Sequence, residues 1–401
     1  MRVDSKAFDV IVVGAGPIGS VTAEALARTS LRVALLEEHP SIGLPNHCSG
    51  LISPRTLELA GVAEEAVGLA RFSSARVWGP GGKHLWLRSN SVQAIAIDRP
   101  RFDQLLAKRA VDAGATLMLD TQAHRFVRLE ERVQVEARAG ESTLHLYAPL
   151  LIGADGANSR VARWMGKKPA CEIIPAIKAD VIFQGSGTDS IEIFVGNSIA
   201  PGWFGWIIPL QGGVARIGIG ATRAPRRYFE SFLDLIRRKF GDFVVEGTRS
   251  ASLPLGPARD FVVDNVMLVG AAARQTKPTT GGGIYFGIQA AQLAAATAAK
   301  AVERGDCSHR KLAEYERAWH RSGGRELVYG HWLRRGFRSL SDKGLDLIVE
   351  LFGQSWAQNW LSRLGDMDYP SRLFAPPAAI RKKQVASPKS MKTRRRVSLG
   401  A

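Results

Sequence analysis

The chain has 401 residues, 45% apolar and 23% charged, a balance typical of a soluble globular protein with a sizeable core. No run of about 18 consecutive apolar residues is present, so we expect no membrane-spanning helix; the start of the chain also lacks the apolar core of a signal peptide. Three widely spaced cysteines, Cys48, Cys171 and Cys307, form neither a disulfide framework nor a zinc site. These features predict a cytoplasmic protein with no bound metal.

The net charge of +17 is concentrated at the end of the chain. Residues 377–401 contain eight Lys and Arg and no acid, which predicts a disordered basic tail. One interpretation is a solvated extension without a role, and another is peripheral attraction to anionic lipid headgroups. We expect no nucleic acid, because no aromatic residue is interleaved with the charges.

The most informative element begins at the first predicted strand, residues 8–13, which is almost wholly apolar. Gly14-Ala-Gly16-Pro17-Ile18-Gly19 follows at once. In a strand-turn-helix junction, Gly14 permits the turn, Gly16 lets the backbone approach a pyrophosphate, and Gly19 lets the helix pack on the sheet. The free N–H groups at the start of that helix favour an anion.

A second predicted strand, residues 31–36, ends in two acids, Glu37 and Glu38. They follow the glycines at roughly the 20-residue spacing at which a carboxylate accepts ribose hydroxyls. We choose Glu37, the first residue past the strand, with Glu38 as its neighbour. The pattern predicts a dinucleotide site but does not separate FAD from NAD.

The rest of the chain predicts an α/β (α+β) protein: a Rossmann-like domain with a parallel sheet, an antiparallel-sheet domain and C-terminal helices. Alternating strands between Cys171 and Leu255, with a helix over 228–240, indicate the antiparallel domain. In chain order we expect a helix at 98–113, strands at 115–119, 127–148 and 150–155, an alanine-rich helix at 290–301 and helices over 315–364. The predicted parts are 1–170 and 259–305 (FAD-binding, the first with inserted strands), 171–258 (substrate-binding), 306–376 (helical) and 377–401 (basic tail).

Four stretches resemble the geranylgeranyl reductase family of flavoproteins, within the class that shares the aromatic-hydroxylase FAD fold. They are GAGPIG at 14–19, GLPNHCSG at 43–50, PGWFGWIIP at 201–209 and VGAAARQTKPTTGGGI at 269–284. The resemblance implies a bound FAD, reduced by NAD(P)H or another donor. The reduced flavin then passes hydride to a carbon-carbon double bond of an isoprenoid lipid. The protein positions the cofactor and tunes its reactivity.

The resemblance also implies cofactor contacts in later segments. Asp155 and Gly156 match the second FAD motif of the class, with Asp155 near the ribityl and pyrophosphate region; a tight Asp-Gly turn is the structural alternative. Arg99 would face the cofactor from the start of a helix, although a solvent-exposed arginine fits nearly as well. The turn Pro278 to Ile284, with Gly281, Gly282 and Gly283, can present backbone N–H groups to the flavin edge.

Cys48 matches the family's active-site cysteine, where a thiol donates a proton or shapes the pocket. His47 competes for the role because imidazole titrates near neutral pH, and Tyr285 is a third candidate. Ordinary packing is the alternative for a single cysteine.

Aromatic residues in the predicted strand 204–209 suggest a substrate wall. Phe204 and Trp206 share one face of an alternating strand, and Trp203 takes the other. An apolar wall suits an isoprenoid, but core packing explains the pattern equally well.

One departure from the class concerns Gly270-Ala271, where members usually carry Gly-Asp. Ala271 cannot accept the ribityl hydrogen bond, a loss on the order of 1 kcal/mol, so we expect weakened FAD binding.

Two alternative functions stand beside the reductase. One is a flavin monooxygenase or halogenase on the same fold, and the other is a non-catalytic flavoprotein that binds lipid or a partner. The sequence does not identify the prenyl substrate.

Overall fold

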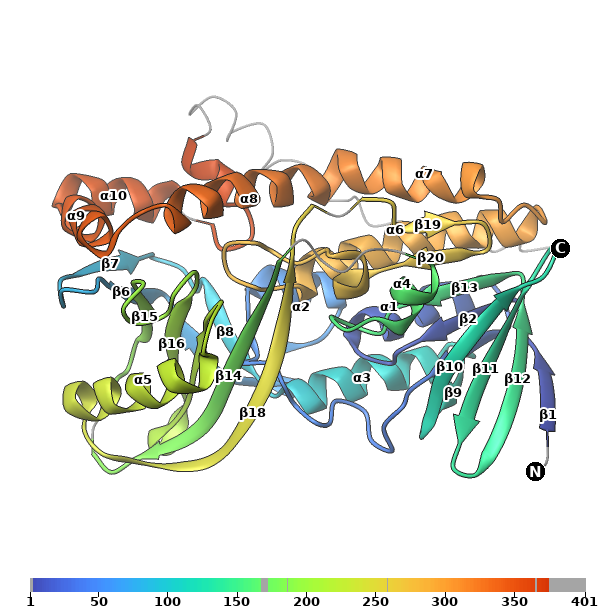
Figure 1. Cartoon of the computed structure of the whole chain (residues 1–401), viewed down its shortest axis with the longest axis horizontal. Helices are drawn as coiled ribbons and strands as arrows, with labels where there is room; N and C mark the ends of the chain where they lie inside the picture. Colours follow the sequence, from blue (N-terminus) through green and yellow to red (C-terminus); the bar gives the residue numbers. More distant parts are fainter. Residues whose placement is uncertain (1–2, 167–171, 186, 258, 365, 375–401) are drawn as a thin grey trace, which may run out of the picture.

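The computed structural model describes residues 3–166, 172–185, 187–257, 259–364 and 366–374. Figure 1 shows an elongated molecule with a parallel sheet and its helices at one end and an antiparallel sheet at the other. Cys171 and the predicted basic tail lie outside the described residues.

A six-stranded sheet has the order β19-β20-β13-β2-β3-β9. Neighbouring strands are parallel except β19 and β20. Its central strands are apolar throughout because both faces are buried. The strands predicted at 8–13, 31–36, 115–119 and 150–155 are confirmed as β2 (Val10–Val13), β3 (Val33–Leu36), β9 (Thr116–Met118) and β13 (Leu150–Gly153), joined by β19 (Val262–Val263) and β20 (Val266–Leu268).

Helix α1 (Pro17–Ala27) starts directly after β2 and packs against α3 (Arg99–Asp112) and α6 (Ile284–Glu303). A four-stranded sheet of order β1-β12-β11-β10 packs on the same core. The predicted strands at 127–148 correspond to its antiparallel members, whereas β1 was not predicted. The strands are β1 (Val3–Ala7), β10 (Thr121–Arg128), β11 (Val133–Ala139) and β12 (Ser142–Ala148).

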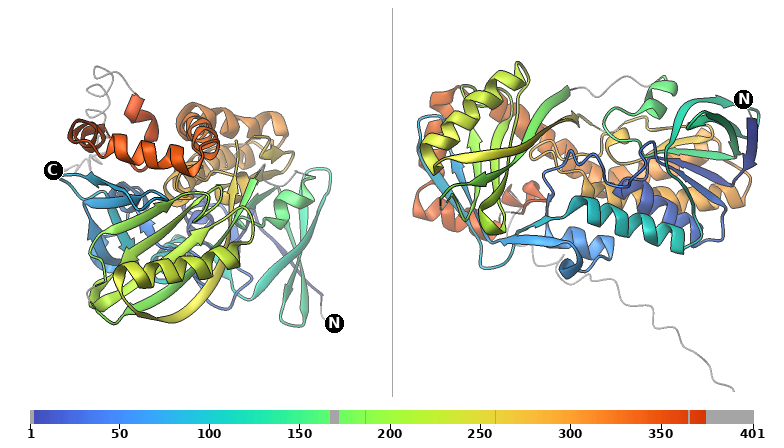
Figure 2. Two further views of the ribbon diagram at one scale, coloured as in Figure 1. Left: turned by 60° about the vertical axis from the view of Figure 1, so that its left-hand side comes forward. Right: turned by 90° about the horizontal axis from the view of Figure 1, so that it is seen from below.

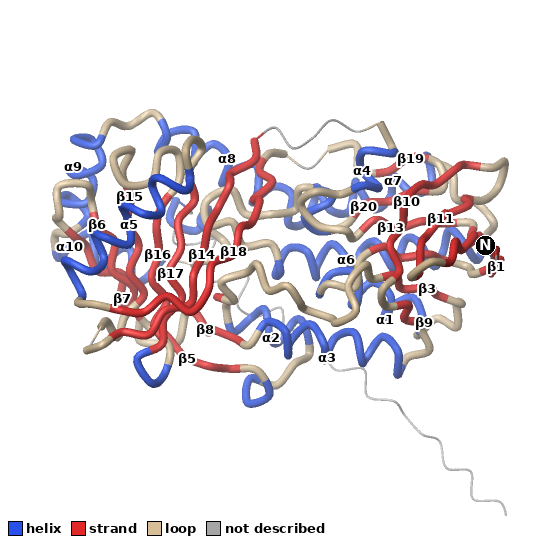
Figure 3. Tube along the Cα trace, turned by 60° about the horizontal axis from the view of Figure 1, so that its bottom comes forward, coloured by secondary structure: helices blue, strands red, loops and turns tan. Residues whose placement is uncertain are grey.

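The antiparallel end of the molecule is a seven-stranded sheet of order β18-β14-β17-β16-β15-β6-β7. Helix α5 (Pro225–Phe240) covers one face of this sheet (Figure 3). Its Phe229 and Phe232 are buried in the core between helix and sheet. The segment 74–88 pairs into this sheet through β15, although the predicted boundary placed it in the first part of the FAD-binding domain. The strands are β6 (Ser74–Trp78), β7 (His84–Arg88), β14 (Glu172–Phe183), β15 (Ile191–Val195), β16 (Phe204–Pro209), β17 (Val214–Gly220) and β18 (Phe243–Leu255).

A small three-stranded sheet has the order β4-β8-β5. Its strands are β4 (Leu51–Ile52), β5 (Gly68–Phe72) and β8 (Ala94–Ile97), and short helices α2 (Pro54–Ala60) and α4 (Arg160–Trp164) complete the connections. In sequence, β4 and β5 precede β6 and β7, and β8 follows them.

The C-terminal helices run along one side of the molecule, opposite α5 (Figure 2). They are α7 (His309–Trp319), α8 (Arg325–Arg338), α9 (Asp342–Phe352) and α10 (Ser355–Leu364), followed by a 3-10 turn η5 (Pro370–Phe374). Among the described residues, no helix combines the length and apolar character needed to cross a bilayer.

Candidate active site

The β2–α1 turn has the geometry of a pyrophosphate cradle. Gly14 has φ +99°, and an added Cβ would lie 2.7 Å from the Ala154 carbonyl oxygen. At Gly19 an added Cβ would lie 1.8 Å from the Gly14 carbonyl oxygen, so only glycine lets α1 pack here. By contrast, a Cβ on Gly16 would meet nothing within 4 Å. Backbone contacts thus require two glycines, and the third faces the open space that a phosphate needs.

The start of α1 offers unpaired backbone donors to an anion. Its N-cap is Gly16, with no side-chain cap, and Pro17 is the first helical residue. Ile18 packs inward, since an added Cβ on Gly270 would lie 3.1 Å from its Cγ1. Ile18 therefore packs the glycine turn at 14–19 against the segment 269–284.

Glu37, rather than Glu38, lies at the glycine turn. Glu37 Oε2 accepts a hydrogen bond from the Ala15 backbone N–H at 2.9 Å, and Oε1 lies 2.6 Å from His39 Nδ1. Glu38 points to the surface, 3.6 Å from Arg160 and 45% exposed. The position supports Glu37 as the ribose-binding acid.

The second motif has a structural role in the chain itself. Asp155 Oδ2 accepts hydrogen bonds from the Arg160 and Val161 backbone N–H groups at 2.7 and 3.1 Å, and Oδ1 accepts one from Ser159 Oγ at 2.6 Å. The carboxylate thus anchors the start of α4. Burial raises the pKa of Asp155. Gly156, with φ +76°, has open space beside it, and cofactor contact by this pair stays a prediction.

The segment that follows Asp155 and Gly156 and the segment that begins at Gly270 share a small cleft of about 150 Å³. Asn158 and Ser159 line it from one side and Ala271 to Arg274 from the other. Gly270, with φ +65°, begins the 3-10 turn Gly270–Ala273 that carries Ala271.

Replacing Ala271 by aspartate is expected to tighten FAD binding. The new carboxylate would supply the acceptor that the class usually carries, a gain of about 1 kcal/mol or roughly fivefold in affinity. Titration of the apoprotein with FAD, followed by flavin fluorescence, measures the change. Ala271→Val, which adds bulk without an acceptor, is the control; an equal affinity of both variants would contradict the interpretation.

The glycine loop before α6 is closed by two backbone hydrogen bonds. Lys277 N–H donates to the Gly282 carbonyl at 3.0 Å, and Gly281 N–H donates to the Lys277 carbonyl at 2.9 Å. An added Cβ on Gly282 would lie 2.8 Å from Lys277 Cε, and one on Gly283 would lie 3.2 Å from Thr276 Oγ1. Pro278 is buried against α8, and Ile284 begins α6. The hydrogen bonds therefore fix the shape of the loop, and Lys277 and Thr276 leave little space for a side chain at Gly282 or Gly283.

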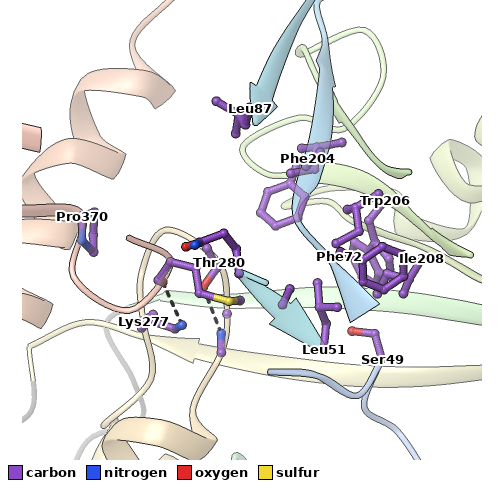
Figure 4. A pocket seen from close by; sticks show the side chains of 18 of the residues that line it. Ser49, Leu51, Phe72, Leu87, Phe204, Trp206, Ile208, Lys277, Thr280 and Pro370 are labelled. Carbon is purple, nitrogen blue, oxygen red and sulfur yellow. Dashed lines mark hydrogen bonds between the residues drawn. The ribbon is translucent and has the colours of Figure 1, made fainter. Parts of the chain in front are cut away.

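A cavity of about 460 Å³ connects this loop to the antiparallel sheet. Gly281, Gly282, His47 and Cys48 belong to its lining. Apolar side chains from β4, β5, β15 and β16 also line it, among them Leu51, Phe72 and Trp206 (Figure 4). The cavity thus joins three segments that are far apart in sequence.

All three predicted aromatic residues line this cavity. Phe204 stacks on Trp203 with ring centroids 5.0 Å apart, and Trp206 lies 6.0 Å from Phe204. Strand alternation predicted the opposite face for Trp203. The structure differs because Trp203 precedes β16, in the turn after Ala200, so strand alternation does not apply to it.

Cys48 lies half-buried at the cavity, and His47 is exposed there. Buried cations from the antiparallel sheet hold their loop: Lys178 Nζ donates to the Cys48 carbonyl at 3.0 Å, and Arg216 Nη1 donates to the Ser49 carbonyl at 2.9 Å. Arg99 also interacts with the Cys48 side chain, while its guanidinium pairs with Asp103 at 2.9 Å. Arg99 therefore supports the cysteine loop from the FAD-binding side.

Tyr285 lies apart from this cavity. Its hydroxyl is 3.0 Å from the Tyr369 hydroxyl, its side chain is buried in the core, and it is absent from the cavity lining. Burial raises the pKa of Tyr285, with the hydrogen bond to Tyr369 acting in the same direction. The position gives a proton-donating role little support.

Sequence reasoning missed four charged residues at the site. Lys178 and Arg216 are each the single cation of a largely apolar alternating strand. This pattern in the sequence could have identified them as candidate site residues. Lys277 lines the cavity and forms a buried ion pair of 2.8 Å with Asp368, for which no local pattern exists.

Replacing Lys178 by methionine is expected to flatten the pH dependence of stability. Burial lowers the pKa of Lys178 from 10.5. Between the lowered value and 10.5 the unfolded chain binds the extra proton, so wild-type stability rises with pH in that window. Urea unfolding at both ends of the window should show a smaller rise for Lys178→Met. The exposed Lys108→Met is the control, and equal rises in wild type and Lys178→Met would contradict the expectation.

A parallel sheet with a glycine cradle and an acid after its second strand, joined to a sheet that walls an apolar cavity, defines a flavin-dependent class of oxidoreductase. A family model described as "FAD binding domain" matches residues 7–325. Digeranylgeranylglycerophospholipid reductase 1 of Methanococcoides burtonii is 32% identical over 355 residues, covering 85% of this chain and 86% of that protein. The chain belongs to this FAD-binding family and to the family of the digeranylgeranylglycerophospholipid reductases.

Solved structures agree with this assignment. A geranylgeranyl bacteriochlorophyll reductase-like protein from Thermoplasma acidophilum superposes with a TM-score of 0.83 and 26% identity, covering 92% of this chain and 98% of that chain. The flavin-dependent brominase Bmp2 has a TM-score of 0.67 and 18% identity, covering 86% and 93%, and shares the fold alone. The predicted family and fold class are confirmed, and the monooxygenase or halogenase alternative has support only from distant structural similarities of this kind.

Proposed function

We propose that the protein reduces carbon-carbon double bonds of an isoprenoid lipid chain, with FAD as its cofactor. The observation that carries this proposal is the 460 Å³ apolar cavity between the Cys48 loop, the glycine loop and the aromatic wall. The curated relatives carry names of reductases of digeranylgeranylglycerophospholipids. Their similarity covers 85% and 86% of this chain.

The chain's own residues fit an extended dinucleotide. The open space over Gly16 and the uncapped start of α1 suit the pyrophosphate, and Glu37 suits the ribose. Gly281 and Gly282 line the cavity in which the flavin ring would lie. When bound, FAD supplies hydride chemistry that no side chain offers.

The cavity wall binds and orients the lipid chain in this proposal. Trp203, Phe204 and Trp206 offer apolar surface, and each buried methylene contributes about 0.8 kcal/mol. The same wall excludes water from the reacting double bond. Lys178 and Arg216 fix the loop that carries Cys48. Cys48 Sγ holds the proton that the second alkene carbon needs after hydride transfer to the first. The exposed His47 then returns a proton from solvent to the thiolate.

The reductant and the cellular location complete the proposal. We infer that NAD(P)H or another external donor reaches the flavin transiently, because the chain carries a single Rossmann glycine turn. We also infer a cytoplasmic protein that associates peripherally with membranes, helped by its basic tail.

Anaerobic single-turnover experiments test the function. The FAD-loaded protein is reduced chemically without oxygen and mixed with a geranylgeranyl lipid, and flavin reoxidation and product mass are followed. We expect reoxidation, with a mass gain of one hydrogen molecule per double bond. Cys48→Ala should slow it, whereas Cys307→Ala, buried in the core and absent from the cavity lining, should not. Turnover that requires oxygen and an aromatic substrate would overturn the proposal.

A further inference from the structure

The C-terminal helices expose an unusual apolar surface. Among the described residues, four large apolar side chains are more than half exposed, and all belong to α8, α9 or α10. Their exposed fractions are 64% for Trp332, 52% for Phe337, 65% for Leu347 and 62% for Trp356. Large apolar side chains that gather on one part of a folded surface are typical of an interaction site.

The outer face of α8 combines these residues with arginine. Arg325, Val328, Trp332 and Arg335 are exposed and recur every three or four residues, so they lie along one side of the helix. The Arg335 guanidinium lies 5.3 Å from the Trp332 ring centroid. The opposite side is buried: Arg334 pairs with Glu172 at 2.9 Å, and Gly330 faces Pro278.

The chain that follows these helices in sequence is strongly basic. Residues 325–374 hold seven Lys and Arg against six Asp and Glu, whereas residues 377–401 hold eight Lys and Arg and no acid. The turn η5, which precedes this basic segment, contacts α8. Aromatic side chains beside arginines are typical of segments that lie in the interface of an anionic bilayer. A second copy of the chain is a less suitable partner, because pairing would bring together two copies of the basic segment 377–401.

The surface also adjoins the proposed substrate cavity. Leu361 and Ser362 of α10 and Leu87 and Arg88 of β7 line the cavity, and Arg88 and Ser362 are exposed. The cavity therefore reaches the surface between β7 and α10. Figures 1 and 2 show α8, α9 and α10 together on this side of the molecule.

We propose that the outer side of α8, α9 and α10 docks on an anionic lipid bilayer and places the cavity opening beside it. Docking at this place would admit a lipid chain directly from the membrane into the cavity, and only this purpose of the docking rests on the proposed function. The docking itself follows from the exposed aromatic residues and the charge.

Vesicle flotation with the full-length chain tests the docking surface. Vesicles of phosphatidylcholine and phosphatidylglycerol in equal amounts are compared with phosphatidylcholine alone. We expect binding to the mixed vesicles, reduced about tenfold or more in Trp332→Ser/Leu347→Ser/Trp356→Ser. The matched control, Ile182→Ser/Val244→Ser, removes exposed apolar side chains from β14 and β18 and should bind like wild type.

Other outcomes would overturn the proposal. These are wild-type binding that the triple variant retains, binding that disappears only when the chain is truncated after residue 376, and self-association abolished by the triple variant without vesicle binding. With the prenyl lipid in detergent, the triple variant should keep wild-type turnover, because none of its three residues lines the cavity. Failure of wild type in detergent would refute the function, while flotation still decides the docking surface.

Discussion

Replacing Gly16 by alanine should abolish tight FAD binding while leaving the apoprotein folded. The Gly16 backbone has φ −64° and ψ 179°, which alanine adopts without strain. An added Cβ touches no protein atom within 4 Å, so it would occupy only the space through which the pyrophosphate approaches the backbone. We expect a loss of about 3 kcal/mol in binding free energy, roughly a hundredfold in affinity.

Gly19→Ala provides the contrast. Its Cβ would lie 1.8 Å from the Gly14 carbonyl oxygen, so this variant should lose apoprotein stability together with FAD binding. Thermal unfolding without FAD, followed by FAD titration, separates the two effects. Wild-type affinity in Gly16→Ala would show that the phosphates do not lie at this turn.

Replacing Asp368 by alanine should cost about 3–5 kcal/mol of folding free energy, because it leaves a buried ammonium without its counter-charge. Lys277 and Asp368 are 4% and 1% exposed, and their charged atoms are 2.8 Å apart. Ser53 Oγ also donates a hydrogen bond to Asp368 at 2.5 Å. The pair fastens the segment of Met367 and Pro370, which line the cavity, to the glycine loop.

A double variant makes this prediction specific. Lys277→Met/Asp368→Ala removes both charges, so it should recover much of the lost stability in urea unfolding. Glu350→Ala breaks the exposed ion pair with Lys83, where both side chains are more than half exposed, and should cost well under about 1 kcal/mol. A similar loss in the Asp368 and Glu350 variants would contradict a buried role for Asp368.

The parts of the fold that sequence predicts best are those set by local rules. Strand β2, the glycine turn and Glu37 follow from apolar continuity and from the backbone geometry that only glycine allows. The antiparallel strands followed from alternation. The membership of Ser74 to Arg88 in the second sheet did not, because strand pairing across more than a hundred residues leaves no local pattern.

The candidate site divides in the same way. Cys48 and the glycine loop could be chosen from their motifs, and the structure brings both to one cavity. Lys178, Arg216 and Asp368 act through partners that are 91 or more residues away in sequence, so their roles depend on tertiary packing. Tyr285 shows the converse, since proximity in sequence to the glycine loop did not place its hydroxyl at the cavity.

A crystal structure of the protein grown with excess FAD tests the central claim most directly. We predict that the pyrophosphate lies over Gly16 at the start of α1, with the flavin ring between Cys48 and Gly281 to Gly283 at the mouth of the apolar cavity. A structure in which that space stays filled by side chains, or in which the ring lies away from the cavity, would contradict the account.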